Sequence, residues 1–303
     1  MKSLKLFFLM VFGLLGGWHP AYAEDVSQRA QLYAERLKQD ALVVLKAAQN
    51  RLGEADQTLQ ETRAIEADVS SSRDPAAIAV ARDAVAEAER GVLEARQLSE
   101  RAKALLARRE KQLDDTRLLA ALEKRMGKVH GTVFPLEGEV RMFNAQGEPV
   151  SDPLRPLQVG DRIVTGKDGS ARLFLAGGNA DALLEPGSEM MITEDNLDEG
   201  FRARLDRGLA RIRANVQHYL KSRFEIRTPA VAIAVRGTEF SVQAFQDGTH
   251  VAVTKGMVHV TPNAAAAEAI DLKAGEEREW SMTGGWGPVT RIVPSSSQVD
   301  WGD

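Results

Sequence analysis

The chain has 303 residues, 44% hydrophobic and 27% charged, which is typical of a globular protein with one large or two ordinary domains. It contains no cysteine, which excludes disulfides, thiolate metal sites and cysteine nucleophiles. The formal net charge of -4 argues against a general nucleic-acid-binding protein, because such proteins present a basic surface to phosphates.

Residues 1–23 have the pattern of an export signal. Lys2 and Lys5 precede an apolar run over residues 6–15, and Ala21-Tyr22-Ala23 supplies the small residues that signal peptidase requires. This run is shorter than the roughly 20 residues that cross a bilayer, which favours cleavage after Ala23 over an uncleaved membrane anchor. We therefore expect a periplasmic or secreted protein of a Gram-negative envelope, with no stable membrane span after cleavage.

Residues 24–126 have the composition of long helices, with apolar residues at three-and-four spacing. The pattern breaks before Asp74 and Pro75, which suit the N-cap and the first position of a second helix. Because the connection is short, the two helices are predicted to form an antiparallel, coiled-coil-like hairpin. The stripes that predict it are Val26, Ala30, Tyr33, Leu37, Val44, Ala48, Leu52, Ala55 and Leu59, then Ile78, Ala81, Val85, Ala88, Val92, Ala95, Ala102, Leu106 and Leu113.

The predicted seam of this hairpin is rich in alanine and buries little apolar area, so the hairpin alone is expected to be marginally stable. Two interpretations stay open. The hairpin either extends the protein or lets it self-associate, or it is a docking rod for another envelope component.

Residues 127–282 change to short alternating runs separated by Gly, Asp, Asn and Pro, such as 139–143, 162–165, 171–175 and 250–254. This spacing predicts an all-β domain with a sandwich, barrel or short solenoid architecture. Residues 283–303 are predicted to be a C-terminal tail. The whole chain is therefore expected to be α+β in two separate parts.

Residues 224–242 contain two alternating runs joined by an irregular segment. Pro229 removes a backbone donor and favours extended geometry at Thr228, so the first strand is expected to end there. Gly237 permits a positive φ or a close backbone approach that a Cβ would obstruct. For the neighbouring Arg236 we favour a structural clamp over ligand binding.

Three pieces of this stretch, Thr228-Pro229-Ala230, Val235-Arg236-Gly237-Thr238 and Phe240-Ser241-Val242, resemble the central motif of the FecR-type periplasmic domain. Supporting pieces lie at 160–166, 184–188 and 256–258, and the resemblance covers about residues 127–282. It implies a non-enzymatic periplasmic module that relays signals through protein contacts. It also implies a structural role for Thr228, Pro229, Arg236, Gly237, Thr238 and Phe240.

In regulatory FecR proteins the domain follows a cytoplasmic anti-sigma segment and a transmembrane helix, which this sequence does not show. We therefore expect an interaction or scaffold module with an unidentified envelope protein partner. The alternatives are an accessory role in cell-surface signalling to an extracytoplasmic sigma factor, and binding of cell-wall glycan or anionic glycolipid.

No catalytic, cofactor or metal site is predicted, because the histidines and acids lack ligand or triad spacing. The strongest charge feature is a basic run over residues 202–227. Alternation places Arg211 and Arg213 opposite Ala210 and Ile212, on a face expected to be exposed. Together with Arg223 they are candidates for binding an anionic partner; the alternative is a solvated face paired with nearby acids.

Overall fold

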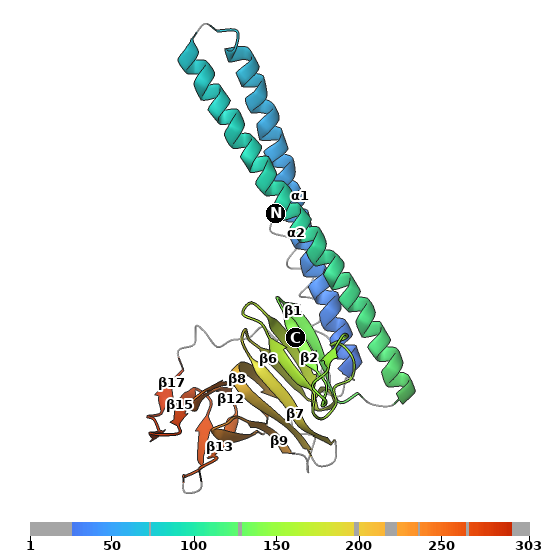
Figure 1. The fold of residues 1–303 in the computed structure, drawn as a ribbon, viewed down its shortest axis with the longest axis vertical. Coiled ribbons are helices and arrows are strands. Elements are labelled where there is room, and N and C mark those ends of the chain that lie inside the picture. Colours follow the sequence, from blue (N-terminus) through green and yellow to red (C-terminus); the bar gives the residue numbers. More distant parts are fainter. Residues whose placement is uncertain are drawn as a thin grey trace, which may run out of the picture. The chain divides into compact units, whose positions relative to one another are not determined.

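The computed structural model describes residues 26–72, 74–126, 129–196, 200–215, 223–235, 237–264 and 267–292, except the side chains of Met126, Asn196 and Arg223. The predicted export signal, the boundary residue Gly127, Arg236 and the tail from residue 293 lie outside these ranges. The fold is α+β in two parts, as predicted: two long helices precede a β-rich region (Figure 1). Within the described ranges, residues 26–29 and 121–292 form one compact unit and residues 30–120 the other.

The helices α1 (Val26–Val69) and α2 (Pro75–Met126) form the predicted hairpin (Figure 1). Asp74 caps α2 as expected, because its Oδ1 accepts a hydrogen bond of 3.0 Å from the Ala76 backbone N–H. Ion pairs from Lys38 to Glu110 (3.1 Å) and from Arg63 to Glu89 (2.7 Å) show that the helices run antiparallel. Neither described helix contains an apolar stretch long enough to cross a membrane.

Alanine dominates the buried positions of the hairpin, as the sequence predicts, with Ala41, Ala81, Ala95 and Ala102 all buried. One position differs from the expected stripe: Val44 is 48% exposed, and Ala41 is buried in its place. Several apolar residues follow each other in this part of α1, so spacing alone did not identify the one that turns inward.

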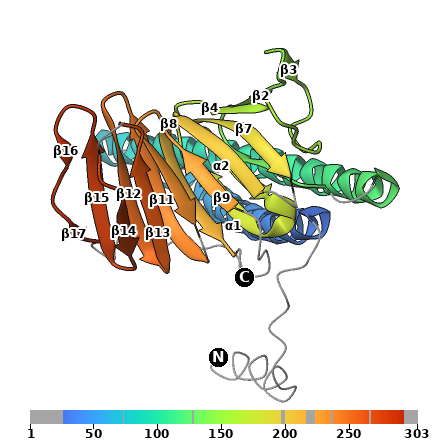
Figure 2. The ribbon, with the colours of Figure 1, turned by 90° about the horizontal axis from the view of Figure 1, so that it is seen from below.

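The strands form two sheets that share the long strand β8 (Gly200–Ala214). The first, sheet A, contains β1 (Thr132–Glu137), β5 (Ser170–Leu175), β6 (Ala180–Leu184), the second half of β8, β11 (Thr238–Phe245), β12 (Gly248–Lys255), β15 (Glu276–Ser281), β16 (Gly285–Trp286) and β17 (Thr290–Arg291). The 3₁₀ turn η1 (Ala176–Gly178) joins β5 to β6. At the outer edge of sheet A, β16 and β17 pair with β15 (Figure 2).

The second, sheet B, contains β3 (Pro149–Val150), β2 (Val140–Phe143), β4 (Arg162–Thr165), β7 (Glu189–Asn196), the first half of β8, β9 (Arg223–Arg227), β10 (Val231–Val235), β13 (Met257–Pro262) and β14 (Ile270–Lys273). The described pairings are antiparallel except that of β8 with β9. Strand β8 changes sheets at Gly208, whose φ is +89°. A Cβ there would lie 2.4 Å from Ser188 Oγ, so only glycine fits this corner.

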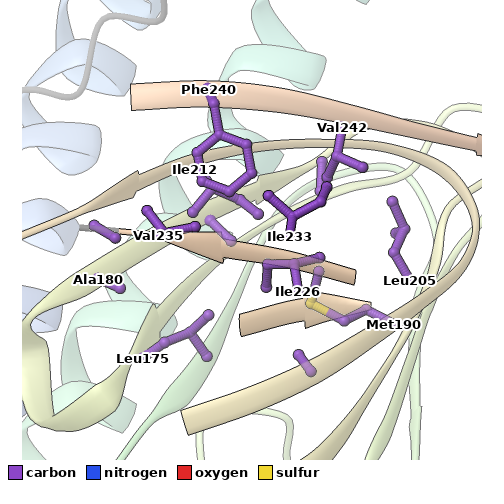
Figure 3. Close-up of a cluster of buried hydrophobic side chains, with 14 of the residues drawn as sticks. Leu175, Ala180, Met190, Leu205, Ile212, Ile226, Ile233, Val235, Phe240 and Val242 are labelled. Atoms are coloured by element: carbon purple, nitrogen blue, oxygen red, sulfur yellow. The ribbon is translucent and has the colours of Figure 1, made fainter. Parts of the chain in front are cut away.

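One hydrophobic core lies between the inner faces of the two sheets. Ile212 and Val242 contribute from sheet A, and Met190, Ile226 and Ile233 from sheet B (Figure 3). The strands do not close into a barrel. Of the sandwich, barrel and short solenoid that the sequence left open, the structure shows the sandwich.

Candidate functional site

The turn at Thr228 and Pro229, between β9 and β10, is closed by buried hydrogen bonds. Thr228 Oγ1 accepts from the backbone N–H groups of Ala230 (3.2 Å) and Val231 (3.0 Å) and lies 2.7 Å from Thr249 Oγ1. Asn263 Nδ2 donates to the carbonyls of Thr228 (3.1 Å) and Pro229 (3.0 Å). Strand β9 ends at Arg227, as Pro229 predicts. The hydroxyl is fully engaged, so this turn is a structural corner.

A second corner lies at Gly237, whose φ of +61° confirms the predicted positive value. Its carbonyl oxygen lies 2.6 Å from the position that a Cβ on Gly256 would occupy. Beside this close approach, Thr238 Oγ1 donates to the Met257 carbonyl at 2.8 Å. Phe240, 3% exposed, is part of the core. The motif residues that the structure describes therefore lie in turns, beside a close backbone approach or in the core.

The two arginines predicted to share an exposed face differ in their surroundings. Arg211 keeps 24% of its side chain exposed and pairs with Glu185 at 2.9 Å. Arg213 is only 7% exposed, so the expected exposure is wrong for this residue. The reason is the register of β6 with β8, which places Asp181 directly opposite Arg213, with 3.0 Å between carboxylate and guanidinium. The side chain of Arg223 lies outside the described residues.

Asp181 is the centre of a buried ionic cluster on the outer face of sheet A. Its carboxylate pairs with Arg29 from the first turn of α1 and lies 3.6 Å from the guanidinium of Arg172 on β5. Both guanidinium groups also lie over the ring of Phe174, at 5.6 and 5.0 Å from its centroid. The cluster, defined as Arg29, Arg172, Asp181 and Arg213, ties the start of α1 to the β-domain. Sequence reasoning missed it because its members come from four separate elements.

On the outer face of sheet B, the basic run is balanced by carboxylates. Arg202 lies between Glu194 (2.6 Å) and Glu225 (3.0 Å). Glu189 is shared by Arg162 (2.9 Å) and Arg207 (3.1 Å). The arginines on this face therefore form a partly solvated row paired with neighbouring acids. This is the arrangement that the sequence analysis gave as the alternative to an anion-binding surface.

A buried carboxylate at the end of β7 has an altered pKa. Asp195 is 6% exposed and lies 3.3 Å from His130, in the segment that leads from α2 into β1. Burial raises the pKa of Asp195 from 3.8 to about 6, and the attraction of His130 opposes that rise. The sequence carries no signal for this pair, because its members are far apart in the chain.

The raised pKa of Asp195 predicts a pH-dependent stability. Between about pH 4 and 6 the folded state binds a proton that the unfolded chain releases, so protonation favours folding. Relative to Asp195→Asn, the wild type should gain about 1 kcal/mol of unfolding free energy between pH 7.5 and 5. Urea denaturation at both pH values measures this difference, with the exposed Asp168→Asn as control. Parallel pH dependence of wild type and Asp195→Asn would contradict the prediction.

Metal chemistry has no support within the described ranges, where no group of three His, Cys, Asp or Glu side chains is placed to hold an ion.

Residues 161–259 match the family model described as FecR protein. This chain carries a FecR domain. The match includes both structural corners, Thr228–Pro229 and Gly237, and so agrees with the resemblance of the motif. No curated protein matches the sequence.

Two solved structures of a candidate anti-sigma factor from Parabacteroides distasonis are similar to part of the chain. They share 22% and 20% sequence identity with it, each at a TM-score of 0.37. Each alignment covers 43% of this chain and 58% of the other, so the chain spans less than two thirds of these structures. The FecR domain by itself supports a signalling or regulatory role.

Proposed function

We propose that this protein is a non-enzymatic module of the cell envelope that receives or relays a signal by binding another protein. The observation that carries the proposal is the FecR domain at residues 161–259. The charged groups named above agree with it, because they form paired rows and a buried cluster. The periplasmic or secreted location and cleavage after Ala23 belong to the same proposal.

We further propose that Arg211 contributes to binding an acidic partner surface. Its side chain is partly exposed on the outer face of sheet A, and its own acid, Glu185, is 28% exposed, so a partner carboxylate can compete for the guanidinium. Arg213 does not suit this role because it is buried on Asp181.

The hairpin, predicted at residues 24–126, and the β-domain, predicted at 127–282, are proposed to act as separate parts, except that residues 26–29 and 121–126 of the helices belong to the compact unit of the β-domain. Apolar side chains on the outside of the helices support a docking or self-association role for the hairpin. They are Leu32, Val43, Ile65, Val80, Leu93 and Leu118, each more than half exposed.

Replacing Arg211 tests the interaction. The full-length protein is cross-linked in intact envelopes and recovered as wild type, as Arg211→Ala and as the exposed control Lys167→Ala. We expect the same partner with wild type and control, and several-fold less with Arg211→Ala, because a charged contact is lost. The unfolding free energy of Arg211→Ala should change by less than about 1 kcal/mol, as for other partly exposed ion pairs.

Two outcomes would count against these proposals. Equal recovery with Arg211→Ala removes this residue from the interface, and no reproducible partner for the wild type contradicts the binding function.

The second candidate function is an accessory role in signalling to an extracytoplasmic sigma factor, which the FecR domain also favours. Deleting the gene should then change transcription from promoters of an envelope-responsive sigma factor. A pure scaffold role predicts no such change while the partner is still recovered.

A further inference from the structure

We propose that the outer face of sheet A binds a second copy of this chain through strands β8, β11, β12 and β15. These four strands lie side by side in the sheet (Figure 2). The proposal rests on the role proposed above for Arg211, and it identifies the acidic surface that this residue meets as the β15 end of the same face on another copy. Glu277, the β15 residue that meets Arg211, lies beyond residues 161–259 of the family match.

The strand register places the side chains of this contact in one row on one face. Arg211 on β8 lies opposite Ser241 on β11. Ser241 lies opposite Ala252 on β12, which in turn lies opposite Glu277 on β15. Directly opposite residues of antiparallel strands project from the same side of a sheet. Their neighbours along the strands, such as Val242, lie in the core, so the row is on the outer face.

The two ends of this face carry opposite charge. At the β8 end, Arg211 and Glu185 lie beside the buried ionic cluster, in which three arginines share one carboxylate. Four arginines against two acids give this end an excess of two positive charges. At the β15 end, Glu277 and Glu279 lie on the outer face with His250, which is 3.5 Å from Glu277. With a neutral histidine, this end has an excess of two negative charges.

Between these ends, the middle of the face is low and nearly neutral. Ser241 and Ala252 have small side chains, and Ala252 is only 5% exposed. Glu239 on β11 and Lys255 on β12 lie opposite each other, so their charges largely cancel. A second sheet can therefore approach the middle of the face to about 10 Å, the usual distance between packed sheets.

A two-fold axis makes this pattern complementary to itself. Arg211 and Glu277 are three strand spacings apart, or about 14 Å, with β11 and β12 between them. An axis parallel to the strands and midway between β11 and β12 brings Arg211 of each copy over Glu277 of the other. In the next row the same axis brings Gln243 over His250, and these side chains can share a hydrogen bond. The dimer therefore contains each contact twice.

Sedimentation equilibrium of the full-length protein tests the proposal with two charge reversals, Arg211→Glu and Glu277→Arg. We expect the wild type to dimerise and each variant alone to have a dimer Kd about ten-fold higher or more, because two contacts between like charges replace two between opposite charges. An equimolar mixture of the two variants should dimerise like the wild type, since in a mixed dimer both contacts again join opposite charges. Recovery in the mixture also shows that both variants are folded.

Lys167→Glu and Glu137→Arg are the matched controls, because they reverse the same charges at exposed positions outside the four strands, and both should dimerise like the wild type. The proposal is overturned if the wild type stays monomeric at sub-millimolar concentrations, or if either Arg211→Glu or Glu277→Arg alone dimerises like the wild type. A mixture of these two variants that stays monomeric also overturns it. If the monomeric wild type recovers a different protein from cross-linked envelopes, this inference fails while the proposed signalling function stands.

Discussion

Replacing Asp181 with alanine is expected to lower the free energy of unfolding by about 3–5 kcal/mol. The carboxylate is 1% exposed and is the shared partner of Arg29, Arg172 and Arg213. Without it, three guanidinium groups stay close together in a medium of low dielectric constant and repel one another. The cost should exceed that of a typical core substitution, because it leaves several buried charges uncompensated.

Urea denaturation of the full-length protein measures this cost. Asp181→Asn keeps the volume and one acceptor oxygen but not the charge, so it should fall between wild type and Asp181→Ala. The exposed Asp168→Ala is the control and should change stability by less than about 0.5 kcal/mol. If Asp181→Ala unfolds like the control, the arginines reach solvent when the carboxylate is removed, and the cluster contributes little to folding.

The second large effect is expected at Gly256, in the corner beside Gly237. Gly256 has a φ of +82°, and an added Cβ would lie 2.6 Å from the Gly237 carbonyl oxygen. The substitution Gly256→Ala therefore combines left-handed backbone strain with a clash against backbone that cannot move aside. We expect it to cost about 3 kcal/mol or more.

Gly147 provides a matched control for this clash. Its φ is +81°, yet a Cβ there would meet nothing within 4 Å. The substitution Gly147→Ala should therefore cost only the conformational strain, about 1 kcal/mol. Thermal or urea unfolding of both variants separates the two terms. Equal costs would show that the contact between Gly256 and Gly237 can relax and that this corner is not tightly packed.

Local features of this chain could be predicted from the sequence. Helix composition and the Asp74-Pro75 start signal predicted the hairpin, because propensity and capping act within a few residues. Pro229 and Gly237 likewise predicted a strand end and a positive φ, since both residues restrict or free their own backbone. The FecR motif rests on the same local corners.

Features that depend on packing between distant residues were decided only by the tertiary structure. Alternation correctly placed Arg213 on the face of β8 that points away from the core residue Ile212. It carries no information about which residues cover that outer face. The register of β6 with β8 sets Asp181 opposite Arg213. The first turn of α1 adds Arg29, which is 152 residues from Asp181 in the sequence. The same long-range register decided the sandwich over the barrel, because strand periodicity determines which face is buried and leaves the order of strands open.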